Sequence, residues 1–304
     1  MKQLRILGHP VGHSKSPAVH QAVFDALGLD WTFGLTDKPD ADAARAFIRA
    51  GKYVGLSVTT PFKPVAAEAV DICAASARLA GGVNVVVNRA GMLLGSNVDG
   101  RGAVTYLEHG GVSFAGTTVA VCGTGPTALS CLHAVALAGA DTIVLLSRSK
   151  DRAQQVLQDY LDLYGTLAHA SINPPSDAGR RSFREALEQV RYLFGSYATS
   201  GAAIQQADII MDATTLGMHE GDPAPFDTGL LHADQTVFDV CYMRPTALIA
   251  AAQAAGARAF DGRAMLLGQG TIVQDLWFEA QGVSCTLSWD ERIALMAPAA
   301  GFTA

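Results

Sequence analysis

Short apolar runs alternate with segments of helical periodicity along roughly the first hundred residues. Apolar runs of about four to eight residues predict strands, and apolar positions three and four apart predict helices. Strands are expected at Leu4–Leu7, Trp31–Leu35, Val54–Val58, Val83–Val87 and Met92–Leu94, with a turn at Arg89-Ala90-Gly91, and helices at Pro17–Leu27, Ala41–Ala50, from near Pro61, and over about Gly100–His109. Ser16 is the expected N-cap of the first helix, because Pro17 suits the first helical position. This alternation predicts a mostly parallel sheet covered by helices on both faces.

After Gly110-Gly111 the alternation begins again. Strands are expected at Thr117–Cys122, Thr142–Leu146, Ile209–Asp212 and Val237–Val240, and helices at Pro126–Ala138, Lys150–Tyr164, Thr246–Ala255 and Gly262–Glu279. A last helix should follow Ser288, because Glu291 stands three residues later and completes a capping box. Two α/β units in series are the simplest arrangement that fits this pattern.

The stretch Gly165–Ala203 fits the alternation least well. It contains Pro174-Pro175 and then an amphipathic run, in which Phe183, Leu187, Val190 and Phe194 share one face of a helix. An extra helix on the surface of the domain is the favoured interpretation. A lid or a subunit contact is the alternative.

Composition narrows the class of protein. The chain has 304 residues, room for about two domains. Hydrophobic residues make up 49% and charged residues 16% of it, which favours packed cores over disorder. The formal net charge is −6 and the isoelectric point is about 5.7, so a basic face for a phosphate backbone is not expected. Non-specific nucleic-acid binding is thereby excluded.

Targeting segments and metal motifs are not expected either. The most apolar stretch, Ala128–Ala140, is shorter than a membrane span and contains Ser130 and His133. The amino-terminal residues turn polar too soon for a signal peptide. The five cysteines are scattered, with no CxxC pair and no metal-ligand spacing. Such cysteines are typical of reduced thiols, so we expect a cytoplasmic protein without a metal site.

A dinucleotide-binding turn is the clearest motif of the second unit. The expected strand Thr117–Cys122 leads into the sequence Gly123-Thr124-Gly125-Pro126-Thr127-Ala128, which a helix follows. In this GxGxxA pattern the first glycine permits a tight turn, the second admits a pyrophosphate to the backbone, and Ala128 lets helix and strand pack closely. Phosphates would then lie at the helix N-terminus, where free N–H groups favour an anion.

The choice between NADP and NAD is made about 20 residues further on, where an NAD site normally has an acidic residue. Here the next strand ends in Ser147-Arg148-Ser149-Lys150-Asp151-Arg152. The Arg148 guanidinium can pair with a 2′-phosphate, and Ser149 and Arg152 can add donors. This turn favours NADP. Asp151 keeps NAD open.

The first unit offers a different set of polar residues, in the loops Gly12–Pro17, Ser57–Lys63, Gly82–Asn84 and Ser96–Gly100. Such loops at strand ends are where ligands bind in open α/β sheets. Hydroxyls, an amide, one lysine and one aspartate suit a small polyhydroxylated substrate. Lys63 held by Asp99 could transfer a proton at an alcohol carbon. Taken alone, the two residues also fit a structural ion pair or separate surface charges.

At these positions the chain resembles the shikimate/quinate dehydrogenase family. The matching motifs run nearly end to end and occur in order: GHSKSP at Gly12–Pro17, VTxPFK at Val58–Lys63, VN at Val83-Asn84, NxDG at Asn97–Gly100, GxGxxA at Gly123–Ala128, the basic turn Ser147–Arg152, ATxxGM at Ala213–Met218, YxxP at Tyr242–Pro245, and DGxxMLxxQ at Asp261–Gln269. Each motif is weak alone, but the ordered set is specific.

The resemblance implies a substrate-binding and catalytic domain of residues 1–101 with 266–304, and a Rossmann-like cofactor domain of residues 102–265. It implies that Lys63 and Asp99 move the proton of the ring 3-hydroxyl while hydride passes to nicotinamide. The implied substrate ligands are Ser14, Ser16, Thr59, Asn84, Tyr242 and Gln269. The implied cofactor site comprises Gly123, Gly125, Pro126, Thr127, Ala128, Ser147, Arg148, Ser149, Arg152, Thr214, Met218 and Met265.

The leading hypothesis is an NADP-dependent shikimate dehydrogenase of aromatic amino-acid (chorismate) biosynthesis. A quinate/shikimate dehydrogenase or related paralogue using NAD is the alternative, because Ser57 stands where the family usually has Asn and the Tyr242 loop is short. A non-catalytic dinucleotide sensor is the alternative from another class, and Lys63 and Asp99 argue against it. We expect a small-molecule substrate, neither nucleic acid nor membrane as a partner, and leave a homodimer open.

Overall fold

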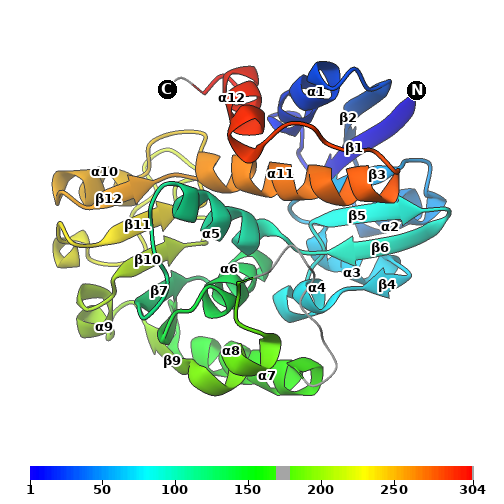
Figure 1. The fold of residues 1–304 in the computed structure, drawn as a ribbon. Helices are drawn as coiled ribbons and strands as arrows, with labels where there is room; N and C mark the ends of the chain where they lie inside the picture. Colours follow the sequence, from blue (N-terminus) through cyan, green and yellow to red (C-terminus); the bar gives the residue numbers. More distant parts are fainter. Residues whose placement is uncertain (169–178, 303–304) are drawn as a thin grey trace. The chain divides into compact units, whose positions relative to one another are not determined.

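The computed structural model describes residues 1–168 and 179–302 and divides the chain into two compact units. One unit comprises residues 1–102 together with the segment from Leu266 onward, and the other comprises Ala103–Met265 (Figure 1). Each unit is built on one six-stranded sheet. Within the described residues, no helix is long and apolar enough to cross a membrane.

The sheet of the first unit mixes parallel and antiparallel pairs. Its order is β2-β1-β3-β5-β6-β4, with β1 at Lys2–Gly8, β2 at Trp31–Asp37, β3 at Gly55–Val58, β4 at Ile72–Cys73, β5 at Val85–Arg89 and β6 at Met92–Ser96. The pairs β1–β2, β1–β3 and β4–β6 are parallel, whereas β3–β5 and β5–β6 are antiparallel. The antiparallel β5–β6 pair follows from the turn at Ala90-Gly91, where both residues have positive φ. A two-residue turn of that kind joins only antiparallel neighbours.

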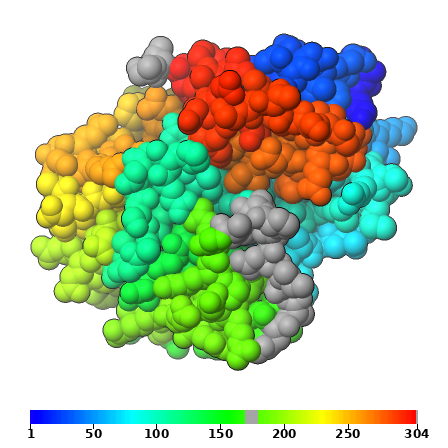
Figure 2. Space-filling model, in the orientation of Figure 1, coloured from blue at the N-terminus to red at the C-terminus, as the bar shows by residue number. Residues whose placement is uncertain are grey.

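Helices cover both faces of this sheet. They are α1 (Ser16–Ala26), α2 (Ala41–Ala50), α3 (Lys63–Ala69), α4 (Ala75–Ala80), the start of α5 (Asp99–His109), most of α11 (Arg263–Ala280), and α12 (Trp289–Ala299). The predicted capping box of Ser288 and Glu291 is confirmed at the start of α12. In Figure 2 the surface of α12 adjoins that of α1, and the two helices pack together. The short elements β4 and α4 were not predicted.

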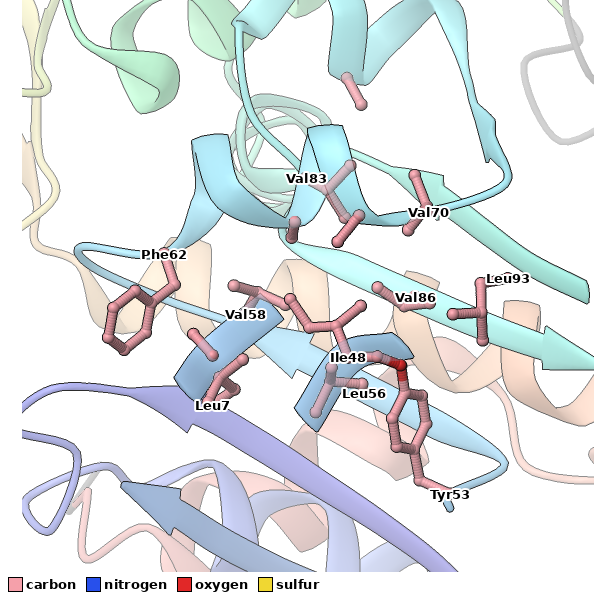
Figure 3. Packing of buried hydrophobic residues seen from close by; sticks show 14 residues of the cluster. Leu7, Ile48, Tyr53, Leu56, Val58, Phe62, Val70, Val83, Val86 and Leu93 are labelled. Atoms are coloured by element: carbon pink, nitrogen blue, oxygen red, sulfur yellow. The ribbon is translucent and has the colours of Figure 1, made fainter. Parts of the chain in front are cut away.

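Two cores fill the space between the sheet and its helices. Leu7, Leu56 and Val58 pack with Ile48 of α2 and with Phe62 (Figure 3). Successive side chains of a strand point to opposite faces of the sheet, so one core lies on each face. The other core is aromatic and includes His20, Phe24, Phe33, Trp277 and Phe278 from α1, β2 and α11. Burial without solvent contact lowers the pKa of His20 to about 3, so this imidazole is neutral.

The start of α1 differs from the expectation. Lys15, not Ser16, is the N-cap residue, and no side chain caps the helix there. Lys15 already has helical dihedral angles, with φ −84° and ψ −9°, so Ser16 is the first residue of the helix. The Ser14 Oγ atom accepts a hydrogen bond from the Ser16 backbone N–H at 3.3 Å. The Ser16 backbone N–H is one of the donors at the helix start that have no partner within the helix. The loop residue Ser14 therefore satisfies it.

The sheet of the second unit is parallel throughout its described pairs. Its order is β12-β11-β10-β7-β8-β9. The strands are β7 (Thr118–Cys122), β8 (Thr142–Ser147), β9 (Arg191–Ser196), β10 (Ile209–Asp212), β11 (Thr236–Asp239) and β12 (Arg258–Phe260). The helices are α6 (Pro126–Leu137), α7 (Lys150–Ala168), α8 (Phe183–Gln189), α9 (Gly201–Gln205) and α10 (Ala247–Ala254), with a 3₁₀ turn η2 (Thr228–Leu230). The strand order reverses between β7 and β10, which is where doubly wound sheets bind ligands. The predicted fold class, two α/β domains with parallel-rich sheets, is confirmed.

The helix predicted across Phe183–Phe194 is only half right. It ends at Gln189, Val190 is extended, and β9 then pairs with β8. Phe194 is exposed on this edge strand, and the Lys150 Nζ atom lies 5.9 Å from its ring centroid. The apolar residues fit a helical period by coincidence, and pairing with β8 decides the outcome. Phe183 packs against His133, as expected for an extra surface helix, while Pro174-Pro175 lie outside the described residues.

Gly55→Ala tests the fit of α11 on the first sheet. A Cβ atom at Gly55 would lie 2.4 Å from Nε1 of Trp277, which donates a hydrogen bond to the Val86 carbonyl at 3.2 Å. Overpacking there should lower the free energy of unfolding by about 1–3 kcal/mol, measured in urea. Gly34→Ala in β2 is the matched control, since the nearest atom there is Nη1 of the flexible Arg5, at 3.6 Å. Equal losses in the two variants would contradict the assigned role of the Trp277 contact.

Candidate active site

Three polar side chains converge where the strands of the first unit end. Lys63 begins α3, shortly after β3, and Asp99 begins α5, shortly after β6. The Lys63 Nζ atom donates to Asp99 Oδ2 at 2.5 Å, and the Asn84 Nδ2 atom donates to Asp99 Oδ1 at 2.6 Å. Asn84 in turn accepts the Val98 backbone N–H at 2.9 Å. The three residues predicted to share a site are thus joined by hydrogen bonds.

Solvent is largely excluded from this ion pair. The side chains of Lys63 and Asp99 are 13% and 9% exposed. An ion pair that has lost its water is held only if its remaining polar atoms have partners. Both carboxylate oxygens of Asp99 have one, and its position at the N-terminus of α5 stabilises its negative charge. Asp99 therefore stays in place as the holder of the Lys63 ammonium.

A further residue, Asn97, shapes the loop that carries Asp99. Its Oδ1 atom accepts the Asp99 backbone N–H at 3.2 Å, and its Nδ2 atom donates to the Gly82 carbonyl at 2.8 Å. The Ser76 hydroxyl accepts the Asn97 backbone N–H at 3.3 Å. Asn97 was part of a predicted motif but had no predicted role. An asparagine two residues before the aspartate is the usual signal for such a side-chain turn.

The other predicted substrate residues of this unit lie on separate segments. Ser16 is buried and Ser14 half-buried at the start of α1, and Thr59 is half-buried after β3. Gln269 is buried on α11, and its Nε2 atom donates to the Leu266 carbonyl at 3.1 Å. Tyr242 belongs to the second unit, after β11.

A glycine that was not singled out brings α11 close to the helix of Asp99. A Cβ atom at Gly102 would lie 2.3 Å from the backbone nitrogen of Gln269. The two helices therefore pack backbone against backbone, one turn after Asp99. A larger residue at Gly102 would move Gln269 away from α5. The spacing of Gly102 behind the NxDG motif is the signal that could have identified it.

The predicted dinucleotide turn has the required backbone. Gly123 has φ +111°, and a Cβ atom there would lie 3.0 Å from the Ala213 carbonyl oxygen. Gly125 is the N-cap of α6, and a Cβ atom there would have nothing within 4 Å. Pro126 opens the helix and Ala128 is fully buried beneath it. The N-terminus of α6 thus faces open space beside Gly125, an arrangement that suits a pyrophosphate.

The turn after β8 leaves two arginines exposed. Ser147 and Ser149 build the turn itself, since the Ser147 hydroxyl donates to the Ser149 carbonyl at 2.6 Å and Ser149 Oγ accepts the Arg152 N–H at 3.3 Å. Arg148 and Arg152 are exposed. Neither has an acidic partner within 4 Å among the residues that the structure describes. Two guanidinium groups are therefore available for a phosphate at the end of β8.

Three further residues of the implied cofactor site lie after β10 and at the start of α11. Thr214 follows β10, and its hydroxyl accepts the Leu216 backbone N–H at 3.1 Å. Met218 is exposed, whereas Met265 is buried. Within residues 1–168 and 179–302, no group of three His, Cys, Asp or Glu side chains is placed to hold a metal.

These features are typical of a two-domain α/β oxidoreductase class, with a GxGxxA turn at the end of a parallel strand in one unit and a lysine–aspartate ion pair in the other. A family model described as "Shikimate dehydrogenase substrate binding domain" matches residues 6–86. The chain is 34% identical to the shikimate dehydrogenase (NADP⁺) of Symbiobacterium thermophilum over 92% of this chain and 90% of that protein. It is 33% identical to the same enzyme of Methanopyrus kandleri over 90% and 88%. The chain belongs to the shikimate dehydrogenase family.

Solved structures agree on the fold. The shikimate 5-dehydrogenase of Thermus thermophilus, in complex with NADP(H) and shikimate, superposes with a TM-score of 0.78 at 24% identity, over 98% of this chain and all of that one. The quinate dehydrogenase of Corynebacterium glutamicum, in complex with NAD, gives a TM-score of 0.77 at 23% identity, over 98% and 99%. Enzymes with different substrates and cofactors thus share this fold, so fold alone does not choose between them.

Gly125→Ala separates cofactor binding from folding. Because space beside Gly125 is open, an alanine there should leave the free energy of unfolding within about 0.5 kcal/mol of the parent. The methyl group would meet a bound pyrophosphate, so the Kd for NADP⁺ should rise at least about tenfold, one 1.4 kcal/mol step. Gly123→Ala is the comparison, since its φ of +111° should make that variant unstable. Unchanged NADP⁺ affinity in Gly125→Ala would contradict the assigned phosphate position.

Proposed function

We propose that this chain is an NADP-dependent shikimate dehydrogenase, which interconverts 3-dehydroshikimate and shikimate in the biosynthesis of chorismate. The observation that carries the proposal is the desolvated Lys63–Asp99 ion pair, held by Asn84. Relatives more than 30% identical over nine-tenths of the chain are named shikimate dehydrogenase (NADP⁺). A non-catalytic sensor would have no use for a partly buried lysine fixed in this way.

Lys63 is the group that exchanges a proton with substrate. In the direction of reduction, its ammonium donates a proton to the ring carbonyl oxygen as that oxygen gains negative charge. In the direction of oxidation, the neutral amine takes the hydroxyl proton. When bound, NADPH would supply the hydride that adds to the carbonyl carbon of the ring, and NADP⁺ would accept that hydride in the reverse direction. Asp99 holds Lys63 at a constant position in both directions, and Asn84 fixes the carboxylate of Asp99.

The anionic carboxylate of shikimate needs donors elsewhere in the first unit. Ser14 and Ser16 are proposed to bind it, with Tyr242 as a further ligand. Thr59, Asn84 and Gln269 are proposed to bind the ring hydroxyls. Hydrogen bonds from hydroxyls to a charged group contribute about 1.5–3 kcal/mol each, so a site without a dedicated arginine is adequate for a small anion.

Arg148 is the main reason to propose NADP over NAD. Its exposed guanidinium, with Arg152 one helical turn later, suits the 2′-phosphate that only NADP carries. Asp151 lies in the first turn of α7 and is the residue that would serve an NAD ribose instead. Ser57 is the observation that keeps quinate as a second candidate substrate. The Ser57 hydroxyl is buried and has no hydrogen-bond partner among the described residues, at a position where the family usually has Asn.

The proposal includes a cytoplasmic location, a small-molecule substrate as the principal partner, and a homodimer as the assembly. The homodimer is tested by the molar mass of the purified chain in light scattering. A mass of one chain at micromolar concentration would remove that part of the proposal and leave the enzymatic part unaffected.

Lys63→Ala should abolish most activity without unfolding the protein. A positioned acid–base group contributes about 10²–10⁴-fold to turnover, so kcat for NADP⁺ reduction with shikimate should fall by that factor while KM changes little. Asp99→Asn should act in the same way, and the double variant should be no slower than the worse single variant. Lys15→Ala, a nearby lysine outside the ion pair, is the control and should keep near-normal turnover.

The parent enzyme provides the reference for that series. Its reduction of NADP⁺ and NAD⁺ is measured with shikimate and with quinate, and shikimate with NADP⁺ should give the highest kcat/KM. Absence of activity with either substrate would overturn the proposed function. Near-normal turnover in both Lys63→Ala and Asp99→Asn would leave the activity in place and reject the proposed pair.

Arg148→Ala should change the choice of cofactor. Loss of a guanidinium–phosphate pair should raise the KM for NADP⁺ by about tenfold or more, while the KM for NAD⁺ stays within about twofold. Arg184→Ala is the matched control, because Arg184 is an exposed arginine of the same unit that pairs with Glu188. Equal losses for NADP⁺ and NAD⁺ would show that Arg148 stacks on the adenine or holds the loop.

A further inference from the structure

Two buried aspartates end neighbouring strands of the second sheet. Asp212 closes β10 and Asp239 closes β11, and the two residues are direct partners in the parallel register. Each is only 1% exposed. Neighbouring strands lie about 4.8 Å apart, and residues in register point to the same face. Within the described part of the chain, neither carboxyl group has a lysine, arginine or histidine as an ion-pair partner.

Each carboxyl group holds the beginning of a loop. Asp212 Oδ1 accepts the Thr214 backbone N–H at 2.9 Å. Asp239 Oδ1 accepts the Cys241 backbone N–H at 2.9 Å, and Asp239 Oδ2 accepts the Thr246 hydroxyl at 2.6 Å. The first loop, residues 213–218, carries Thr214 and Met218 of the implied cofactor site, and the family resemblance implies that Met218 packs near the nicotinamide end. The second loop, residues 240–246, carries a proposed substrate ligand.

The two loops are locked to each other. The Cys241 thiol donates to the Leu216 carbonyl at 3.3 Å. Gly217 has φ +91°, and a Cβ atom there would lie 2.5 Å from Cγ2 of Thr246. The Asp222 carboxylate accepts the Gly217 backbone N–H at 3.0 Å. A displacement of either loop would therefore be passed to the other.

Burial and mutual repulsion set the charge of the pair. Burial, and then the neighbouring charge of Asp239, raise the pKa of Asp212 to about 7. Burial also raises the pKa of Asp239. The groups that face the pair are Cys122 of β7, Tyr197 after β9, Cys241 and the Asp261 carboxylate, and Asp222 acts on the Cys241 thiol. Burial raises the pKa of both thiols and of the phenol, so they are neutral near pH 7 and supply no positive charge.

We infer that Asp212 and Asp239 are positioning residues that act together: with one proton between them, they hold loops 213–218 and 240–246 in the geometry that binds the nicotinamide end of NADP. The inference rests on the proposed function, because it assigns a role within the same cofactor site. When Asp212 loses this proton, its carboxylate carries a second negative charge beside that of Asp239. Repulsion between the carboxylates then pushes apart the two strand ends to which the loops are attached.

The pH dependence has a defined sign. The folded protein holds the Asp212 proton up to about pH 7, whereas an unfolded chain releases it near the ordinary aspartate value of about 4. The free energy of unfolding therefore falls as the pH rises from about 4 to about 7. Above about pH 7 both carboxylates of the pair are charged. Cofactor affinity should follow the charge of the folded protein, so it should be highest below pH 7 and fall above it.

The test measures the Kd of NADP⁺ for the purified chain without substrate, between pH 6 and pH 9. A coupling of one pKa unit between binding and the Asp212 proton corresponds to about a tenfold weaker Kd at the alkaline end. Asp212→Asn keeps the acceptor for Thr214 and removes the charge, so its Kd should stay within about twofold across the range. Asp208→Asn is the matched control, since Asp208 is an exposed aspartate at the opposite end of the same strand. Its Kd should follow that of the parent.

The Kd of the variant divided by the Kd of the parent at the same pH cancels the effect of titration of the cofactor's own phosphate. A parent Kd that is flat above pH 7, or the same alkaline loss in Asp212→Asn, would overturn the inference. A loss of affinity in Asp212→Asn that is equal at every pH would also overturn it, because it would show a merely structural role. Asp239→Asn removes the other charge and provides the same test if Asp212→Asn does not fold.

Failure of the inference is distinguishable from failure of the proposed function. NADP⁺ binding with no alkaline loss rejects the positioning role and leaves the enzyme assignment intact. An absence of NADP⁺ binding at every pH rejects the proposed function, and this inference with it.

Discussion

A lysine and an aspartate face each other in the first unit where water is largely excluded, and the loops around them are organised to keep them there. Removing two charges from water costs several kcal/mol per ion unless their remaining polar atoms have partners. Lys63 also stands at the N-terminus of α3, where the helix dipole disfavours a positive charge. Asp99 offsets that disadvantage, and Asn84 and Asn97 supply the hydrogen bonds that keep its carboxylate and backbone in place.

The topology explains how residues far apart in the chain meet. Lys63 follows β3 and Asp99 follows β6, while Asn84 directly precedes β5, which runs antiparallel between those strands. An antiparallel strand begins where its neighbours end, so all three residues lie at one edge of the sheet. A wholly parallel sheet would have placed Asn84 at the other edge. The hairpin at Ala90-Gly91 is therefore part of the construction of the site.

The second unit uses the same principle with a different result. Its parallel strands all end at one edge, which gathers the glycine turn after β7, the arginine turn after β8 and the two aspartates of β10 and β11. Backbone amides and guanidinium groups at such an edge suit the phosphates of a dinucleotide. The buried carboxylates accept backbone hydrogen bonds from the loops that follow β10 and β11.

The motifs and the hydrophobic periodicity together allow much of the fold and of the candidate site to be predicted from the sequence. The glycine turn could be recognised because its spacing states a backbone requirement, and Ala41–Ala50 because its apolar positions fit only a helix. The strand β9 could not, since its apolar residues continue the helical period of α8 by coincidence. The pairing of Asp212 with Asp239 depends on strand register, which no local pattern contains.

Lys63, held by Asp99, is proposed to exchange the proton of the substrate. A crystal structure of the chain with shikimate and NADP⁺ would show whether Lys63 reaches the substrate. A ring hydroxyl oxygen is expected within about 3.2 Å of Lys63 Nζ, with the hydrogen bonds from Lys63 and Asn84 to Asp99 retained. Shikimate bound with every hydroxyl oxygen more than about 6.5 Å from Lys63 Nζ, beyond the reach of even one bridging water, would contradict this role of Lys63.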